Sequence, residues 1–222
     1  MPAKSAKPRP TSPQDDLAFM RSIVEGGGRT SMTLAICYLA GGLLYGLQCL
    51  FHIGQVTGLI RWPELANLIF VVMITVSFLA VLTWAILKDR RDGPPNRGPL
   101  ATRSLNAAFS ATGMANSAVI IVFGVGAIRD QDFAIWLYYA AIVFALQAAA
   151  WFMAWTLKKK GWMLATALGG WVTAVALGVL VREPLWYLGV CTVALFALFA
   201  LPGWILFRDA RTADKAAGSK AA

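Results

Sequence analysis

Six long stretches of the sequence contain no Asp, Glu, Lys or Arg, and this spacing of charges is the dominant pattern in the chain. Each stretch has at least 21 residues, and roughly 20 helical residues are enough to cross the hydrocarbon core of a bilayer. The pattern therefore predicts an all-α polytopic membrane protein, a bundle of six transmembrane helices. The predicted spans are Ser31–Ile60, Leu65–Leu87, Ser104–Ile128, Phe133–Leu157, Gly161–Val181 and Pro184–Phe207.

The predicted spans and the loops between them differ in length. Span one is longer than a bilayer requires, and its helix is expected to end near Gly54, Thr57 and Gly58, because glycine and threonine are poor helix formers. The loop Lys88–Arg103 is rich in glycine and proline and is expected to be irregular. Every other loop has two to four residues, which predicts antiparallel hairpins. Pro202 is expected to kink span six.

Small residues recur at every fourth position in spans one, three, four and five. Such stripes let helix backbones approach closely inside a membrane, so these four spans are expected to pack tightly. Spans two and six lack long stripes and are expected at the periphery, facing lipid or a partner. The stripes are Gly42 and Gly46; Ala107, Ala111 and Ala115; Ala141, Ala145 and Ala149; and Gly170, Ala174 and Gly178.

The two ends of the chain differ from the spans. Residues 1–13 are rich in Lys, Pro and Ser and are expected to be disordered. Gln14–Glu25 has apolar residues at helical spacing, which predicts a short amphipathic helix on the cytoplasmic membrane face or, alternatively, a docking helix for a partner subunit. The predicted organisation is a cytoplasmic tail with this interfacial helix (1–30), the six-helix bundle (31–207) and a cytoplasmic C-terminal tail (208–222).

Basic residues are concentrated in alternate loops. Seventeen of the twenty Lys and Arg residues fall in the two tails and in the second and fourth loops, whereas the other three loops hold one each. The positive-inside rule makes the basic side cytoplasmic. This predicts both termini in the cytoplasm and a multi-pass protein of the cell inner (plasma) membrane. The net charge of +9 fits contact with anionic lipid headgroups, and nucleic-acid binding is not expected.

Six residues within the spans form the candidate ligand-binding site. Polar side chains are costly in a bilayer and tend to face the bundle interior or a cavity. Counting from the span ends places the three amides and the serine of this set near mid-bilayer, and the histidine nearer the outer surface. Two interpretations remain open: the amides join helices by hydrogen bonds, or they line a polar cavity. The six residues are Tyr45, Gln48, His52, Asn116, Ser117 and Gln147.

Composition and motifs offer little support for catalysis. The chain is 58% hydrophobic and 14% charged, whereas soluble domains carry about 25% charged residues. No carboxylate lies in any span, no hydrolase, metalloprotease or nucleotide-binding motif occurs, and His52 is the only histidine. Cys37, Cys49 and Cys191 form no CxxC motif and are expected to be small packing residues. We therefore predict no enzymatic activity, no cofactor and no metal site.

Three functions are compatible with these features. The first is a non-enzymatic membrane protein that binds or passes a small neutral or amphipathic molecule at a polar mid-membrane cluster. The second is an accessory or scaffold subunit of a larger membrane complex, with no ligand of its own, and the third is a membrane sensor or regulator. The expected partners are the lipid bilayer, such a ligand, and either a membrane partner subunit or further copies of the chain.

Overall fold

The computed structural model describes residues 32–91 and 100–219, and every regular element within them is helical. The six predicted spans all form helices, and the sixth is built from two α-helices joined by a π-helical turn. The elements are α2 (Met32–Val56), α3 (Glu64–Arg91), α4 (Leu100–Asp130), α5 (Phe133–Lys158), α6 (Gly161–Val179), α7 (Pro184–Leu195), the π-helical turn η1 (Phe196–Ala200) and α8 (Leu201–Ser219).

Six helical segments within the described residues are long and apolar enough to cross a membrane. They coincide with the six predicted spans, with α7, η1 and part of α8 forming the last one. The all-α bundle is therefore confirmed, and the chain is an integral, multi-pass membrane protein in contact with the lipid bilayer. The first helix ends at Val56, followed by Gly58 in a left-handed conformation, as the sequence predicts.

The short loops join neighbouring helices as antiparallel hairpins, which confirms the prediction from their lengths. At the α4–α5 turn, the side chain of Asp132 accepts a hydrogen bond from the backbone N–H of Ala134 and caps α5. At the α5–α6 turn, Lys159 adopts a left-handed conformation, and its N–H bonds to the carbonyl of Trp155. Both devices satisfy backbone groups that a helix end leaves unpaired.

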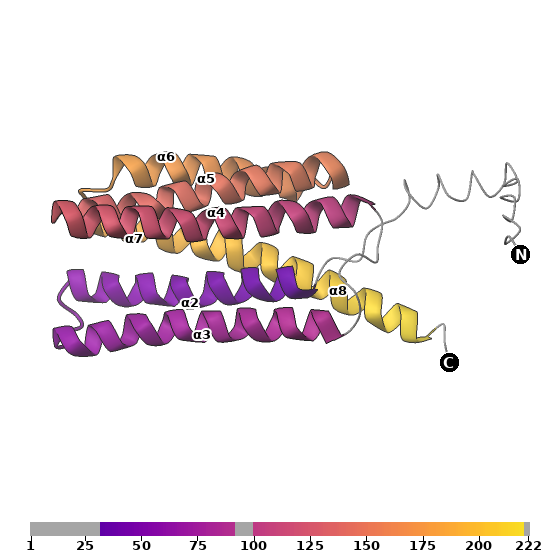
Figure 1. Ribbon diagram of the computed structural model, residues 1–222, viewed down its shortest axis with the longest axis horizontal. Coiled ribbons are helices and arrows are strands. Elements are labelled where there is room, and N and C mark those ends of the chain that lie inside the picture. Colours follow the sequence, from indigo (N-terminus) through magenta and orange to yellow (C-terminus); the bar gives the residue numbers. More distant parts are fainter. Residues whose placement is uncertain (1–31, 92–99, 220–222) are drawn as a thin grey trace, which may run out of the picture.

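The helices form two groups that the last span connects (Figure 1). α4, α5 and α6 lie together, α2 and α3 form a separate pair, and the yellow α7–η1–α8 helix crosses between them. α2 packs against all three parts of this last span, whereas α6, which packs chiefly against α5, contacts mainly the α7 part of it. The last span is therefore the element that holds the two groups together.

The crossing between α2 and the last span is very close. A Cβ on Gly42 would overlap the backbone of Ala200, and a Cβ on Gly203 would overlap the backbone of Leu39. A Cβ on Gly46 would stand 2.9 Å from the ring of Phe196. Glycine on both helices thus lets the backbones approach, which is a common way for membrane helices to associate.

The predicted distribution of spans between core and periphery is partly wrong. Span two is peripheral as expected, since α3 makes an extensive contact with α2 alone among the described helices. Span six, also expected outside, is the most buried of the six, because its Ala200 and Gly203 meet Gly42 and Leu39 of α2 at very close range. Span three, expected inside, is mostly exposed, and Ala107 and Ala111 of its small-residue stripe face away from the protein.

Pro202 is accommodated by a local change of helix type. Proline has no N–H and crowds the carbonyl four residues before it. The turn immediately before it is π-helical, and the N–H of Leu201 bonds to the carbonyl of Phe196, five residues back. The helix then continues through Pro202 to Ser219, well beyond the predicted end of the span at Phe207.

Two predicted segments fall partly or wholly outside the described residues. The amphipathic helix expected at Gln14–Glu25 lies outside them. Within the loop expected to be irregular over 88–103, the structure extends α3 to Arg91 and starts α4 at Leu100, so those residues are helical. Residues 92–99, which hold the glycines and prolines of this loop, are also outside the described part.

The two ends of the bundle differ in charge. At one end, which we call the basic end, lie Lys88, Lys159, Lys160, Arg208 and Arg211. Their neighbours include aromatic rings: Lys88 stands over Trp84 at 5.3 Å and Lys159 over Trp155 at 4.9 Å. At the opposite end, Arg129 pairs with the adjacent Asp130 at 2.7 Å.

Candidate functional site

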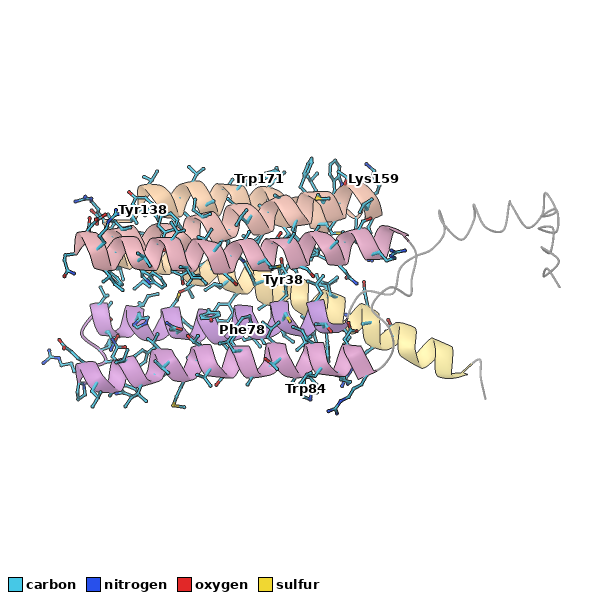
Figure 2. The ribbon with its side chains drawn as sticks, in the orientation of Figure 1. Tyr38, Phe78, Trp84, Tyr138, Lys159 and Trp171 are labelled. Carbon is cyan, nitrogen blue, oxygen red and sulfur yellow. The ribbon has the colours of Figure 1, made fainter. Side chains whose placement is uncertain are left out.

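The amide of Gln147 is used within the protein. The hydroxyl of Tyr38 on α2 donates a hydrogen bond to Oε1 of Gln147 on α5. Figure 2 shows Tyr38 between α2 and the neighbouring group of helices. The bond ties the α2–α3 pair to α5, so at this residue the interpretation of a hydrogen bond between helices is the one that the geometry supports.

Tyr38 is the centre of an aromatic cluster. Its buried ring lies 5.6 Å from Phe109 of α4, 5.2 Å from Trp151 of α5 and 5.2 Å from Phe199 of η1, measured between ring centroids. The edge-to-face geometry of the first two pairs is the favourable one for aromatic rings. The indole N–H of Trp151 is buried with no hydrogen-bond partner among the described residues. This cluster joins four elements of the bundle around one hydroxyl.

Gln48 and Asn116 differ from Gln147 in having no partner. Oε1 of Gln48 on α2 and Oδ1 of Asn116 on α4 are shielded from solvent and accept no hydrogen bond from the described residues. An amide oxygen in this situation costs about 1–3 kcal/mol relative to a satisfied one. Both atoms are therefore acceptors that a donor from another molecule would satisfy.

A third unpartnered amide lies on α3. Oδ1 of Asn67 is also buried without a hydrogen-bond donor in the described part of the chain. Asn67 is not among the predicted site residues, because span two was expected at the periphery. The signal was present, since Asn67 is the only amide between Leu65 and Leu87.

The remaining three candidate residues make local contacts. Tyr45 packs its ring against Phe78 of α3 at 5.4 Å and lies beside Thr75. Nδ1 of His52 is 2.9 Å from Oε1 of Gln55, one turn along the same helix. The hydroxyl of Ser117 donates to the carbonyl of Gly113 on its own helix, and the side chain is exposed. His52 and Ser117 are thus satisfied within their own helices.

The three predicted amides do not share one depth. Gln147 bonds to Tyr38, and Gln48 lies ten residues beyond Tyr38, about 15 Å further along α2. The pairs Phe109–Trp151 and Gly124–Trp136 set the register of α4 against α5 and bring Asn116 to within about one turn of the level of Gln147. Counting residues from span ends missed this because it ignores how far neighbouring helices are shifted along each other.

Metal-ligating side chains are sparse in the described part of the molecule. Within residues 32–91 and 100–219, no three His, Cys, Asp or Glu side chains come together as a metal site. His52 instead faces Gln55, and Asp130 faces Arg129. Among the described side chains, the buried polar atoms without a hydrogen-bond partner are the amide oxygens of Gln48, Asn67 and Asn116 and the indole nitrogen of Trp151.

No protein-family model matches the chain, and neither a curated protein nor a solved structure matches it. The functional interpretation therefore rests on the residues of this chain and on their geometry.

Proposed function

We propose that this protein binds, or passes across the membrane, a small neutral or amphipathic molecule that carries a hydrogen-bond donor, and that it does so without catalysis. The observation that carries the proposal is the pair of buried amide oxygens on Gln48 and Asn116, which have no donor among the described residues. Both residues belong to apolar helices long enough to cross a membrane.

The chemistry of the spans favours an uncharged ligand. Buried polar groups in folded proteins are nearly always paired, with protein or with ordered molecules, so two orphaned acceptors favour an external donor such as a hydroxyl or an amide. The spans carry no charged residue between Ser31 and Ile60 or between Ser104 and Ile128, where the two acceptors lie. A ligand with a formal charge would find no counter-ion there, and burying an unpaired charge is costly.

The proposal includes an orientation. We place the basic end in the cytoplasm, with both termini on that side, in the inner (plasma) membrane of the cell. The bias of Lys and Arg toward this end supports the placement by the positive-inside rule. Lys88 and Lys159 over Trp84 and Trp155 add support, because lysine and tryptophan side chains together are typical of the membrane–water interface.

Three matched substitutions test the binding proposal. Gln48→Leu and Asn116→Leu remove unpaired acceptors, so the thermal midpoint in detergent should stay the same or rise while small molecules that copurify with the protein are lost. Gln147→Leu is the control: it breaks the bond from Tyr38, so the midpoint should fall while the copurified content is kept. Mass spectrometry of gently extracted protein measures this content. Unchanged content in both Gln48→Leu and Asn116→Leu would overturn the proposal.

A second candidate function, an accessory subunit or homo-oligomer, is favoured by the exposed face of α4. Over residues 107–118 the exposed side chains are small or weakly polar except for Met114, whereas large apolar residues such as Ile121 and Val125 are exposed further along the helix. Small residues at an exposed helix surface allow another helix to approach closely. Native mass spectrometry from mild detergent would test this function, and a strictly monomeric protein would contradict it. The face comprises Ala107, Ser110, Ala111, Gly113 and Ser117.

A further inference from the structure

Two cysteines from different helices meet inside the bundle. Cys191 of α7 belongs to a buried apolar cluster, and Cys49 of α2 packs against that cluster. Each lies seven residues from the helix end that faces the Arg129 side of the bundle, at Val56 and at Pro184 respectively. At the rise of an α-helix, both thiols are therefore about 10 Å inside that end.

The register between α2 and the last span is separate evidence that the two cysteines lie close together. α2 and the last span run antiparallel, with Gly42 against Ala200 and Gly46 against Phe196. Continuing this register along α2 brings Cys49 to within about half a turn of Cys191. The missing side chains at Gly42 and Gly46 also let the backbones approach closely, and a disulfide requires its two Cα atoms to be only about 4.4–6.8 Å apart.

The surroundings hold α7 in place but do not complete a metal site. Tyr187, one turn before Cys191, donates a hydrogen bond of 2.7 Å to the carbonyl of Leu137 and so fixes α7 to α5. No third metal-ligating side chain joins the two thiols within the described residues. Cys191 is buried and Cys49 is half-buried, and both lie within helices that are long and apolar enough to cross a membrane, so an oxidant that reaches them from the bilayer must be lipid-soluble.

We propose that Cys49 and Cys191 are a redox-active pair that closes to a disulfide between α2 and α7. The oxidant is a lipid-soluble two-electron acceptor of the quinone class. The two thiols give up two protons and two electrons, the S–S bond forms, and the quinone is reduced to the hydroquinone. The reverse reaction needs an external dithiol. This proposal is independent of the ligand proposed above.

The disulfide would hold the α2–α3 pair and the group of α4, α5 and α6 in a fixed position relative to each other. α3 packs against α2, and the hydrogen bond from Tyr187 joins α7 to α5. A bond between α2 and α7 near the Arg129 side would hold the two groups together at the end of the bundle opposite Lys159. A cross-link across the long segment that contains α3 to α6 restricts the unfolded chain and so raises stability.

Counting free thiols tests the proposal on the full-length protein. Protein reconstituted in lipid nanodiscs is oxidised with diamide or with a short-chain benzoquinone whose ring positions are all substituted, so that thiols are not consumed by addition to the ring; it is then freed of oxidant, denatured and labelled with maleimide-polyethylene glycol. The wild type should fall from three labelled thiols to one, and dithiothreitol should restore all three in the diamide arm. Cys37→Ser should fall from two labelled thiols to none, because Cys37 takes no part.

Two further variants make the outcome decisive. Cys49→Ser and Cys191→Ser should each keep both remaining thiols after diamide treatment, since serine preserves the size and polarity of the thiol and removes only the redox chemistry. Loss of two thiols in Cys49→Ser would reveal a different pair and overturn the proposal. Three labelled thiols in the oxidised wild type, or a disulfide found only between two chains on a non-reducing gel, would overturn it as well.

Discussion

Gly42 of α2 lies directly against the backbone of Ala200 in the π-helical turn, so close that the glycine has no room for a Cβ. The nearest atoms to such a Cβ are backbone atoms of Ala200 and not the end of a flexible side chain, so no side-chain rotation can relieve the clash. The contact is therefore the tightest constraint on how the α2–α3 pair meets the last span.

Gly42→Ala tests this contact. The added methyl group must push α2 away from η1, and overpacking of this kind costs about 1–3 kcal/mol of unfolding free energy. Gly113→Ala is the matched control, since nothing lies within 4 Å of a Cβ built on Gly113. Alanine is the better helix former, so Gly113→Ala should leave stability unchanged or raise it. Thermal or denaturant unfolding in the same detergent checks both, and equal effects would contradict the close crossing.

Tyr38→Phe tests the bond between α2 and α5. The substitution keeps the ring in its aromatic cluster but removes the donor to Gln147, so the unfolding free energy should fall by about 1–3 kcal/mol. Tyr138→Phe, on an exposed position of α5, should have little effect. In a double-mutant cycle, Tyr38→Phe and Gln147→Leu should couple strongly, because each removes the same bond. Additive effects would show that the bond contributes nothing.

Ala111→Leu and Ala167→Leu compare the exposed helix α4 with the buried helix α6. Ala167 is completely buried, and three extra carbon atoms there should cost roughly 1–3 kcal/mol of stability. Ala111 faces outward, so the larger side chain should be tolerated by the isolated chain. If copies or a partner subunit pack on α4, Ala111→Leu should instead weaken their association, as native mass spectrometry would detect. Destabilisation of the monomer by Ala111→Leu would contradict the observed placement of α4.

The proposed orientation is tested by labelling introduced cysteines in a variant in which Cys37, Cys49 and Cys191 are serine. Gly161→Cys lies at the basic end and should be protected from an impermeant maleimide added to intact cells, then become reactive after the membrane is broken. Gln131→Cys lies in the α4–α5 turn at the opposite end and should react in intact cells. Reaction at position 161 from outside would reverse the orientation.

The sequence was sufficient for the spans because the bilayer imposes a length and a polarity that each helix must meet by itself. The end of α2 near Gly54–Gly58 and the short hairpins followed from local chemistry in the same way. Burial of the last span did not follow, because close packing depends on which residues lie opposite each other and not on a long stripe of small residues in each helix. Here Gly42 and Gly46 belong to α2, while Phe196 and Ala200 fill the space that they leave.

In the candidate site, too, the sequence indicates which residues are buried polar groups but not which residues they contact. Polarity alone selected Gln48, Asn116 and Gln147, and all three amides are shielded from solvent or bonded to another helix. Which of them is satisfied depends on the side chain opposite, and only the three-dimensional arrangement places Tyr38 beside Gln147. The packing of Cys49 against the cluster that contains Cys191 was not predicted for the same reason, since it depends on the register between α2 and α7.

The π-helical turn at Phe196–Ala200 also fixes the angular phase of everything that follows it. An α-helix turns by about 100° per residue, and a π-helical turn uses one residue more than an α-helical turn. Deleting one residue from 196–200 would let this turn close as a regular α-helix and leave Gly203 facing the backbone of Leu39, whereas a deletion between the turn and Gly203 would rotate Gly203 by about 100° away from it. Outside this turn, the last span is therefore intolerant of single-residue insertions and deletions, even where every individual side chain could be replaced.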